Sequence, residues 1–152
     1  MTTIGHEHEE GGQQVRIGYA RVSTDDQTLA LQTEALAAAG CDRVYHDRAS
    51  GADTERAGLR EALAALQAGD ALVIWRLDRL ARSSRQLLRI ADDLQARRVD
   101  LISLCDPVDT TTPSGRAQYA ILAAMAELER DLIRERTRAG LDAARRAGRR
   151  GG

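Results

Sequence analysis

Short apolar runs alternate with longer amphipathic stretches along most of the chain. The runs are rich in aliphatic residues, which is typical of buried strands. They predict four strands, at Val15–Tyr19, Arg43–Asp47, Asp70–Trp75 and Asp100–Leu104. The stretches between them predict helices at Asp25–Ala39, Ala57–Leu66 and Ser83–Arg97. Strands joined by helical crossovers predict an α/β fold, with a largely parallel central sheet and helices on both of its faces.

Two of these helices begin with a recognisable capping signal. Thr24 and Gln27, and likewise Ser83 and Gln86, have the spacing of a capping box. Such a box satisfies backbone N–H groups that the first turn of a helix leaves without partners. We therefore expect a helix to begin just after Thr24 and another just after Ser83.

The last predicted element is much longer than the others. Thr112 followed by Pro113 is typical of an N-cap and a first helical position. The helical pattern then continues to about Ala147, which is roughly 35 residues or about 50 Å. Such a helix must extend beyond a small domain. One apolar stripe follows it, made of Ala117, Ile121, Ala124, Met125, Leu128 and Leu132. This stripe is expected to pack on the domain and on a second subunit.

Arginine supplies every basic side chain of the protein apart from histidine. The sequence has 22 basic and 23 acidic residues and a net charge of -1. The lack of lysine has two alternative explanations: biased codon usage, which the composition alone favours, and a need for the guanidinium fork that suits phosphate. The charge is uneven, because residues 130–152 hold eight arginines and three acids, or +5, whereas residues 1–129 hold 14 arginines and 20 acids, or -6. The basic end is expected to contact a polyanion.

Cysteine and hydropathy patterns exclude several other classes of protein. Cys41 and Cys105 lie far apart and lack metal-ligand spacing, which favours a reducing compartment and no bound metal. His6 and His8 lie in a polar N-terminal tail, where two histidines are usually incidental. No apolar run is long enough to predict a membrane span, and the N-terminus lacks a signal-peptide pattern. We expect a cytoplasmic protein.

Candidate chemistry appears first where the first predicted strand ends. Ligands of open parallel sheets gather beyond the carboxyl ends of the strands. Ser23 lies there, two residues after Arg21, and is a candidate nucleophile. The alternative is that Ser23 only caps the next helix. His46 is the only histidine within the predicted fold, so the sequence gives little support for a Ser-His-Asp triad.

A second candidate group follows the third predicted strand. Arg76, Arg79 and Arg82 are spaced three residues apart, which places their guanidinium groups on one side of a turn or short helix. Such a cluster is usually a solvated face. At the end of a strand it can instead hold a phosphate through paired hydrogen bonds. Arg56, after a loop containing Ser50 and Gly51, is a third candidate.

Together these motifs resemble the small serine recombinases of the resolvase/invertase family. The family's nucleophile motif is similar to residues 19–24 followed by Gln27. Its mobile loop is similar to residues 47–51 leading to Arg56, and its paired-arginine motif is similar to residues 77–82. Segments 109–116 and 127–137 resemble the start and middle of its long helix. The resemblance covers Val15 to Gly152, with the motifs in the family's order.

The resemblance implies a catalytic role for several residues. Ser23 attacks a DNA phosphodiester and forms a covalent 5′-phosphoserine intermediate, with no ATP, metal or other cofactor. Arg21, Arg79 and Arg82 stabilise the phosphate's charge, and Arg56 joins them when its loop closes. Gln27 orients the serine or the phosphate, or merely caps its helix. Asp78 and Glu129 position the arginines. The general base stays open between Asp78, a water molecule and a substrate oxygen.

The resemblance also implies partners. Two subunits pair through the long helix, and two dimers form a tetramer on double-stranded DNA, in a prokaryotic cytoplasm and associated with the nucleoid. The expected DNA-contacting side chains are Arg134, Arg138, Arg145, Arg146, Arg149 and Arg150. Gly140 among them is a candidate for a bend. Family members usually continue into a helix-turn-helix domain, whereas this sequence stops at Gly152. No membrane or small-molecule partner is implied.

The expected domain organisation follows from these motifs. Residues 1–14 form a disordered polar tail, 15–112 the catalytic α/β domain, 113–147 the dimerisation and DNA-contacting helix, and 148–152 a basic, glycine-rich end. One alternative function is an inactive DNA-binding or dimerisation module of the same fold, which the presence of Ser23 and its arginines disfavours. Another is an unrelated nucleotide-binding or regulatory domain, for which no glycine-rich phosphate loop is present.

Overall fold

A computed structural model describes residues 12–22, 26–48 and 56–148 of the chain. Within them, parallel strands are arranged in the order β2-β1-β3-β4. The elements are β1 (Arg16–Val22), α1 (Asp26–Ala38), β2 (Arg43–Arg48), α2 (Ala57–Ala65), β3 (Ala71–Ile74), α3 (Leu77–Leu80), α4 (Ser84–Ala96), β4 (Asp100–Ser103) and α5 (Pro113–Arg146). The predicted α/β fold with a parallel sheet is confirmed.

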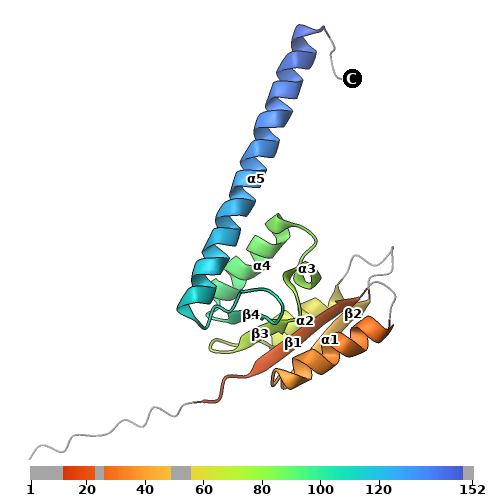
Figure 1. Cartoon of the computed structure of the whole chain (residues 1–152), viewed down its shortest axis with the longest axis vertical. Coiled ribbons are helices and arrows are strands. Elements are labelled where there is room, and N and C mark those ends of the chain that lie inside the picture. Colours follow the sequence, from red (N-terminus) through yellow and green to blue (C-terminus); the bar gives the residue numbers. More distant parts are fainter. Residues whose placement is uncertain (1–11, 23–25, 49–55, 149–152) are drawn as a thin grey trace, which may run out of the picture.

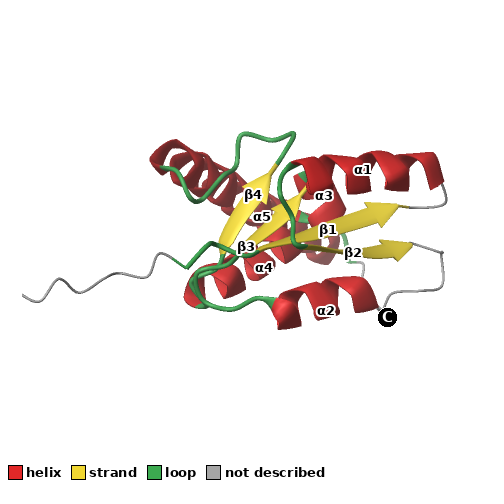
Figure 2. Ribbon diagram, turned by 90° about the horizontal axis from the view of Figure 1, so that it is seen from below, coloured by secondary structure: helices red, strands yellow, loops and turns green. Residues whose placement is uncertain are grey.

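The helices cover the two faces of the sheet unequally. Residues of β1 alternate, so that Ile17 and Tyr19 face one layer and Ala20 faces the other. The first layer contains α2, α3, α4 and the start of α5, whereas α1 packs against Ala20 through the fully buried Leu36. Figure 2 shows α1 on the opposite side of the sheet from α2 and α4. Both faces of the central strands are therefore removed from water.

Strand β1 continues further than the apolar pattern predicts. The expected end is Tyr19, but the strand runs to Val22 because its last residues pair with β2, as far as Val22 opposite Arg48. On its other side β1 pairs with β3 only as far as Tyr19 opposite Ile74. The last three residues of β1 thus extend beyond β3, and Arg21 belongs to the strand rather than to the loop after it.

Helix α5 begins where the sequence predicts and leaves the body of the protein. The Thr112 hydroxyl accepts a hydrogen bond from the Gly115 N–H at 3.0 Å, and Pro113 is the first helical residue. Gly115 lies against Asp109, so closely that an added Cβ would be 1.8 Å from the Asp109 carbonyl oxygen. Tyr119 and Leu122 pack against the core. The rest of α5 extends away from the sheet and runs through Gly140 without a break (Figure 1).

None of the helices in the described ranges is both long enough and apolar enough to cross a membrane.

Candidate functional site

The candidate site lies where the chain reverses its direction of winding across the sheet. Helix α1 leads from β1 to β2 on one face, whereas α2 leads from β2 to β3 on the other. The switch point is therefore between β1 and β3, and ligands of open α/β sheets bind at such a point, beyond the carboxyl ends of the strands. Arg21 lies at this end of β1, and α3 directly follows β3.

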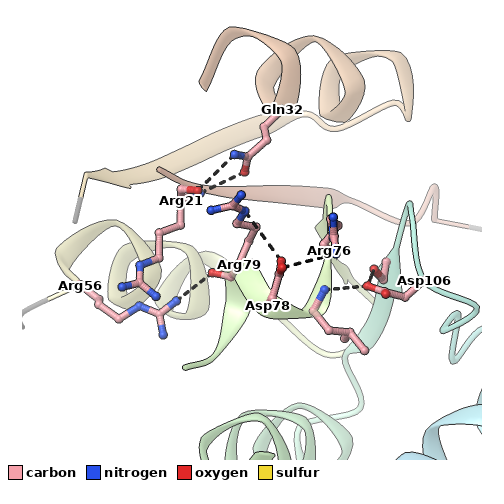
Figure 3. A network of polar contacts seen from close by, with 9 residues as sticks. Arg21, Gln32, Arg56, Arg76, Asp78, Arg79 and Asp106 are labelled. Carbon is pink, nitrogen blue, oxygen red and sulfur yellow. Dashed lines mark hydrogen bonds and ion pairs between the residues drawn. The ribbon is translucent and has the colours of Figure 1, made fainter. Parts of the chain in front are cut away.

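Arg21 is held in place by the side chain of a residue on α1. The Gln32 Oε1 atom accepts a hydrogen bond from the Arg21 N–H at 3.2 Å, and Gln32 Nε2 donates to the Arg21 carbonyl at 3.1 Å (Figure 3). Gln32 is fully buried. It thus replaces the strand partner that Arg21 lacks on the β3 side, because β3 has already ended.

Arg56 is held by a hydrogen-bonded chain that begins at β2. Tyr19 on β1 donates its hydroxyl to Asp47 Oδ2 at 2.9 Å. The same hydroxyl accepts from Arg56 Nε at 3.3 Å and from Nη2 at 3.1 Å, and the guanidinium lies 5.4 Å from the centre of the Tyr19 ring. Arg56 is thereby oriented by groups from two neighbouring strands, although it precedes α2.

Asp47 also fixes the start of α2. Its two carboxylate oxygens accept hydrogen bonds from the backbone N–H groups of Gly58, at 2.7 Å, and Leu59, at 3.0 Å. A carboxylate is favoured at a helix N-terminus, where N–H groups are free and the helix dipole is positive. Gly58 permits this approach, because an added Cβ there would lie 2.3 Å from the His46 carbonyl oxygen.

Helix α3 brings its own carboxylate to two arginines. Asp78 lies 3.6 Å from Arg76 Nη2 and 3.7 Å from Arg79 Nε, with different carboxylate oxygens. The Arg79 carbonyl accepts a hydrogen bond from Arg56 Nη2 at 3.2 Å, which joins α3 to the Arg56 group (Figure 3). Arg79 also lies over the Trp75 ring, 5.9 Å from its centre.

Arg82 lies beyond α3 and not on its surface. The helix ends at Leu80, and Ala81 is extended, so the three-residue spacing does not place Arg82 on the same helical face as Arg79. Its N–H donates to Gln86 Oε1 at 3.0 Å, and the Gln86 N–H donates to Ser83 Oγ at 3.2 Å. Ser83 is thus the predicted N-cap of α4, while Gln86 reaches back to Arg82 rather than to Ser83.

Crowded guanidinium groups and burial set the electrostatics of the site. Burial lowers the pKa of Arg21, and the positive charges of Arg56 and Arg82 lower it further. Burial raises the pKa of Tyr19 to about 12, so its hydroxyl stays protonated at neutral pH. Within the described part of the chain, Arg56 Nη1 and Arg79 Nε are buried without a hydrogen-bond partner. The site therefore presents positive donors suited to an anion.

Comparison with known proteins identifies the family. Residues 16–150 match the family described as Resolvase, N terminal domain. The chain belongs to the resolvase family. It is 54% identical over 136 residues to the DNA-invertase of Enterobacteria phage P7, covering 90% of this chain and 73% of that protein. It is 51% identical over 136 residues to the serine recombinase gin of Escherichia phage Mu, covering 90% of this chain and 70% of that one.

A solved structure agrees with this assignment. The N-terminal catalytic domain of TP901-1 integrase superposes with a TM-score of 0.66 and 29% identity, covering 79% of this chain and 99% of that one. The expectation of a serine recombinase of the resolvase/invertase type is confirmed, both as a family and as an enzyme class.

The structure of this recombinase brings only part of the predicted site together. Arg21, Arg56 and Arg79 gather at the switch point with Asp78, and Arg82 lies close enough to affect the pKa of Arg21. Ser23, Thr24 and the loop containing Ser50 and Gly51 lie outside the described residues. Gln27 and Glu129 are the remaining predicted residues of the site.

Gln27 and Glu129 occupy exposed positions on different helices. Gln27 is in the first turn of α1. Glu129 is on α5, where it lines a cavity of about 130 Å³ together with Leu77 and Ser84. Among the interactions of the described residues, none joins Glu129 to Arg21, Arg56 or Arg79. A positioning role for Glu129 therefore stays a prediction.

The predicted DNA-contacting arginines lie on the free part of α5. Arg134, Arg138, Arg145 and Arg146 are exposed there, and Arg149 and Arg150 fall outside the described residues. Arg134 pairs with Asp131 at 3.6 Å and Arg145 with Asp142 at 3.8 Å. Such exposed pairs are weak and leave both guanidinium groups accessible.

Sequence reasoning missed the residues that orient the arginines. The predicted site does not include Gln32, which bonds Arg21, or Tyr19, which bonds Arg56. It also omits Asp47, which acts on Arg56 through the Tyr19 hydroxyl. Strand alternation gives a signal for Tyr19, since it is two residues before Arg21 and shares its face. Asp47 ends a neighbouring parallel strand. Gln32 has no such signal, because an isolated glutamine within a helix is usually exposed.

The described residues contain no group of three or more His, Cys, Asp or Glu side chains placed to hold a metal ion.

Proposed function

We propose that this recombinase cleaves and rejoins double-stranded DNA with Ser23 as its nucleophile. The observation that carries the proposal is the group of Arg21, Arg56 and Arg79 at the switch point, because Arg56 and Arg79 each have a buried N–H donor that makes no hydrogen bond. Ser23 follows Arg21 by two residues. One of the arginines that would bind the phosphate is therefore a near neighbour, in sequence, of the candidate nucleophile. The name of the phage P7 relative, a DNA-invertase, supports DNA as the substrate.

The proposed reaction is a transesterification at phosphorus, in which one phosphodiester bond replaces another of similar energy. The Ser23 Oγ atom attacks phosphorus, the bond to the 3′ oxygen breaks, and the serine proton leaves as the 3′ oxygen gains one. The product is a 5′-phosphoserine and a free 3′ hydroxyl, and a 3′ hydroxyl of the recombinant partner reverses the step. Arg21, Arg79 and Arg82 stabilise the charge on the transferred phosphate, and Arg56 completes the set.

The other site residues have supporting roles in this proposal. Asp78 orients Arg79, which agrees with its ion pairs to Arg76 and Arg79. Gln27 orients Ser23 or the phosphate, and Glu129 supports the arginines from α5. Tyr19 is unsuited to act as the base, because burial raises its pKa to about 12. The proposal assigns no residue as the general base.

The long helix is proposed to serve both assembly and DNA binding. Large apolar side chains are exposed along α5, at Ile121, Met125, Leu128 and Leu132. A cavity of about 660 Å³ also lies between α4, β4 and α5. Burying this apolar surface against a second copy favours a dimer, and two dimers form the strand-exchange tetramer. The arginines of residues 134–150 follow the DNA backbone. This division keeps 15–112 as the catalytic unit and 113–147 as the assembly helix, in a nucleoid-associated bacterial protein.

The test is a covalent trap. The full chain is fused after Gly152 to a DNA-targeting domain of known site and mixed with nicked duplexes that carry varied core sequences between two such sites. We expect a protein–DNA adduct that peptide mapping places on Ser23, and Ser23→Ala should form none while keeping the wild-type circular dichroism spectrum. An adduct on another residue, or an adduct in Ser23→Ala, contradicts the mechanism. A folded wild-type protein without any adduct favours the inactive DNA-binding module.

A further inference from the structure

Helix α3 carries Asp78 and Arg79 but is too short to hold its own orientation. It has four residues, and its N-cap residue, Arg76, provides no side-chain hydrogen bond. A single helical turn forms few internal hydrogen bonds, so its position depends on contacts from outside. At its C-terminal end the fully buried Leu80 supplies such a contact. Its N-terminal end needs another.

A carboxylate from the segment after β4 supplies that second contact. Asp106 Oδ2 accepts a hydrogen bond from the Leu77 N–H at 2.7 Å and another from Ser103 Oγ at 2.7 Å (Figure 3). Leu77 is the first residue of α3, so this carboxylate satisfies one of the N–H groups that the first turn of a helix leaves without an internal partner. Ser103, the last residue of β4, is buried.

Backbone hydrogen bonds hold the segment that carries Asp106 in place. Past the ends of β3 and β4, the Leu104 N–H donates to the Ile74 carbonyl at 2.9 Å and the Cys105 N–H donates to the Trp75 carbonyl at 2.9 Å. Ser103 closes the turn by donating its N–H to the Val108 carbonyl at 2.8 Å. The segment therefore moves with the two strands, and its carboxylate can set the position of a neighbouring turn.

We propose that Asp106 is a positioning residue for Arg79. By holding the Leu77 N–H, it fixes the turn that places the Arg79 carbonyl within reach of Arg56 and the Arg79 guanidinium beside Asp78 and Trp75. The inference rests on the proposed function, because it assumes that Arg79 binds the transferred phosphate. Asp106 itself touches none of the arginines in the described residues.

The test uses three variants of the fused full chain in the covalent trap. Asp106→Ala removes the acceptor, Asp106→Asn keeps an oxygen acceptor, and Ser103→Ala removes only the second donor. A displacement of about 1 Å at a reacting group can cost on the order of 100-fold in rate. We expect Asp106→Ala to slow adduct formation at saturating DNA by about 10- to 100-fold, with DNA affinity changed by less than about twofold. Asp106→Asn and Ser103→Ala should remain within about threefold of wild type.

A second measurement needs no DNA and reports on Arg79 directly. Trp75 is the only tryptophan, and the Arg79 guanidinium lies over its ring. Its fluorescence emission should therefore shift in Asp106→Ala and return toward wild type in Asp106→Asn. This readout separates the two proposals: a wild-type protein that forms no adduct contradicts the proposed function, whereas the emission still tests the role of Asp106.

Three results overturn the inference: wild-type adduct formation in folded Asp106→Ala, unchanged Trp75 emission in that variant, or an equal loss of rate in Ser103→Ala. Should Asp106→Ala fail to fold, Asp106→Glu tests the same point, because it keeps the carboxylate but displaces it by one methylene. Slow adduct formation and shifted emission are expected for Asp106→Glu, and wild-type values there overturn the inference as well.

Discussion

The amide side chain of Gln32 bonds both backbone polar groups of Arg21, at 3.2 Å and 3.1 Å. The two residues lie on different elements and are joined only because β3 ends before β1 does. This relationship fixes the backbone from which the Arg21 side chain extends toward the phosphate-binding group. Gln32, which is uncharged and buried, thus helps to position one of the arginines of a strongly charged site.

Replacing Gln32 by leucine should destabilise the protein while keeping a similar volume. The substitution leaves the Arg21 N–H and carbonyl without their side-chain partner, which costs about 1–3 kcal/mol in the free energy of unfolding. Urea denaturation followed by circular dichroism measures it. Thr33→Ala is the control, because Thr33 is the exposed neighbour on α1, and it should change stability by less than about 0.5 kcal/mol. Equal effects of the two substitutions would contradict the role of Gln32.

Removing the Tyr19 hydroxyl should slow adduct formation without unfolding the protein. Tyr19→Phe keeps the buried ring but breaks the link between Asp47 and Arg56. A hydrogen bond to a charged group contributes about 1.5–3 kcal/mol, so we expect a loss of about tenfold or more in the trapping rate. Asp47 keeps its bonds to Gly58 and Leu59, which preserves the start of α2.

Tyr119→Phe is a matched control for this substitution. The Tyr119 hydroxyl also donates to a carboxylate, Asp92, at 3.2 Å, and burial likewise raises its pKa to about 12. It lies on α5, and among the interactions of the described residues none joins it to Arg21, Arg56 or Arg79. Trapping by Tyr119→Phe at the wild-type rate is expected, and a loss as large as that of Tyr19→Phe would show that the effect is not specific to Arg56.

Two glycines of α5 should respond to alanine in opposite ways. At Gly115 an added Cβ would lie 1.8 Å from the Asp109 carbonyl, so Gly115→Ala should lower the free energy of unfolding by about 3 kcal/mol or prevent folding. At Gly140 nothing lies within 4 Å, and alanine should stabilise the helix locally by up to about 1 kcal/mol.

The two effects need different measurements. Chemical denaturation detects the change at Gly115, because that residue packs against the body of the domain. The end of α5 frays independently of the core, so amide hydrogen exchange over residues 134–146 detects the change at Gly140. Faster exchange there in Gly140→Ala would contradict the prediction. DNA bending that stays unchanged in Gly140→Ala would count against a hinge at this residue.

Alkaline pH should destabilise the fold partly through Cys41. Burial raises the pKa of its thiol from the ordinary value of 9.0 to about 11. Between these values the unfolded chain has lost the proton and the folded chain keeps it, so stability falls as pH rises. The contribution is complete below about pH 9 and is lost through about pH 11. Urea midpoints measured from pH 7 to pH 10.5 should decrease accordingly.

Thiol labelling checks the same environment independently. Cys105 is exposed, whereas Cys41 is only partly accessible. A maleimide at pH 8 should therefore modify Cys105 of the native protein first, and both thiols at similar rates in urea. Faster labelling of native Cys41 than of Cys105 would contradict the burial of Cys41.

The parts of this protein that follow from local pattern could be predicted from the sequence. Strands, helices and the Thr112 cap are encoded within a few residues, and the order of the motifs indicates the family. The partners of Arg21 and Arg56 depend on which strand lies beside which, and on β3 ending three residues before β1 does. Asp106 acts on α3 from the segment after β4, so the local pattern around Arg79 gives no signal for it either.

The close packing of Gly115 against Asp109 has a consequence for the far end of α5. The helix has 34 residues, so it acts as a lever about 50 Å long whose fulcrum is its first turns, where Gly115, Tyr119 and Leu122 contact the body of the protein. A tilt of about 10° at that fulcrum moves the tip by roughly 9 Å, which is more than the rise of two base pairs of DNA. The absence of a side chain at Gly115 thus helps to set the direction of α5, and with it the position of the basic residues at its far end relative to DNA.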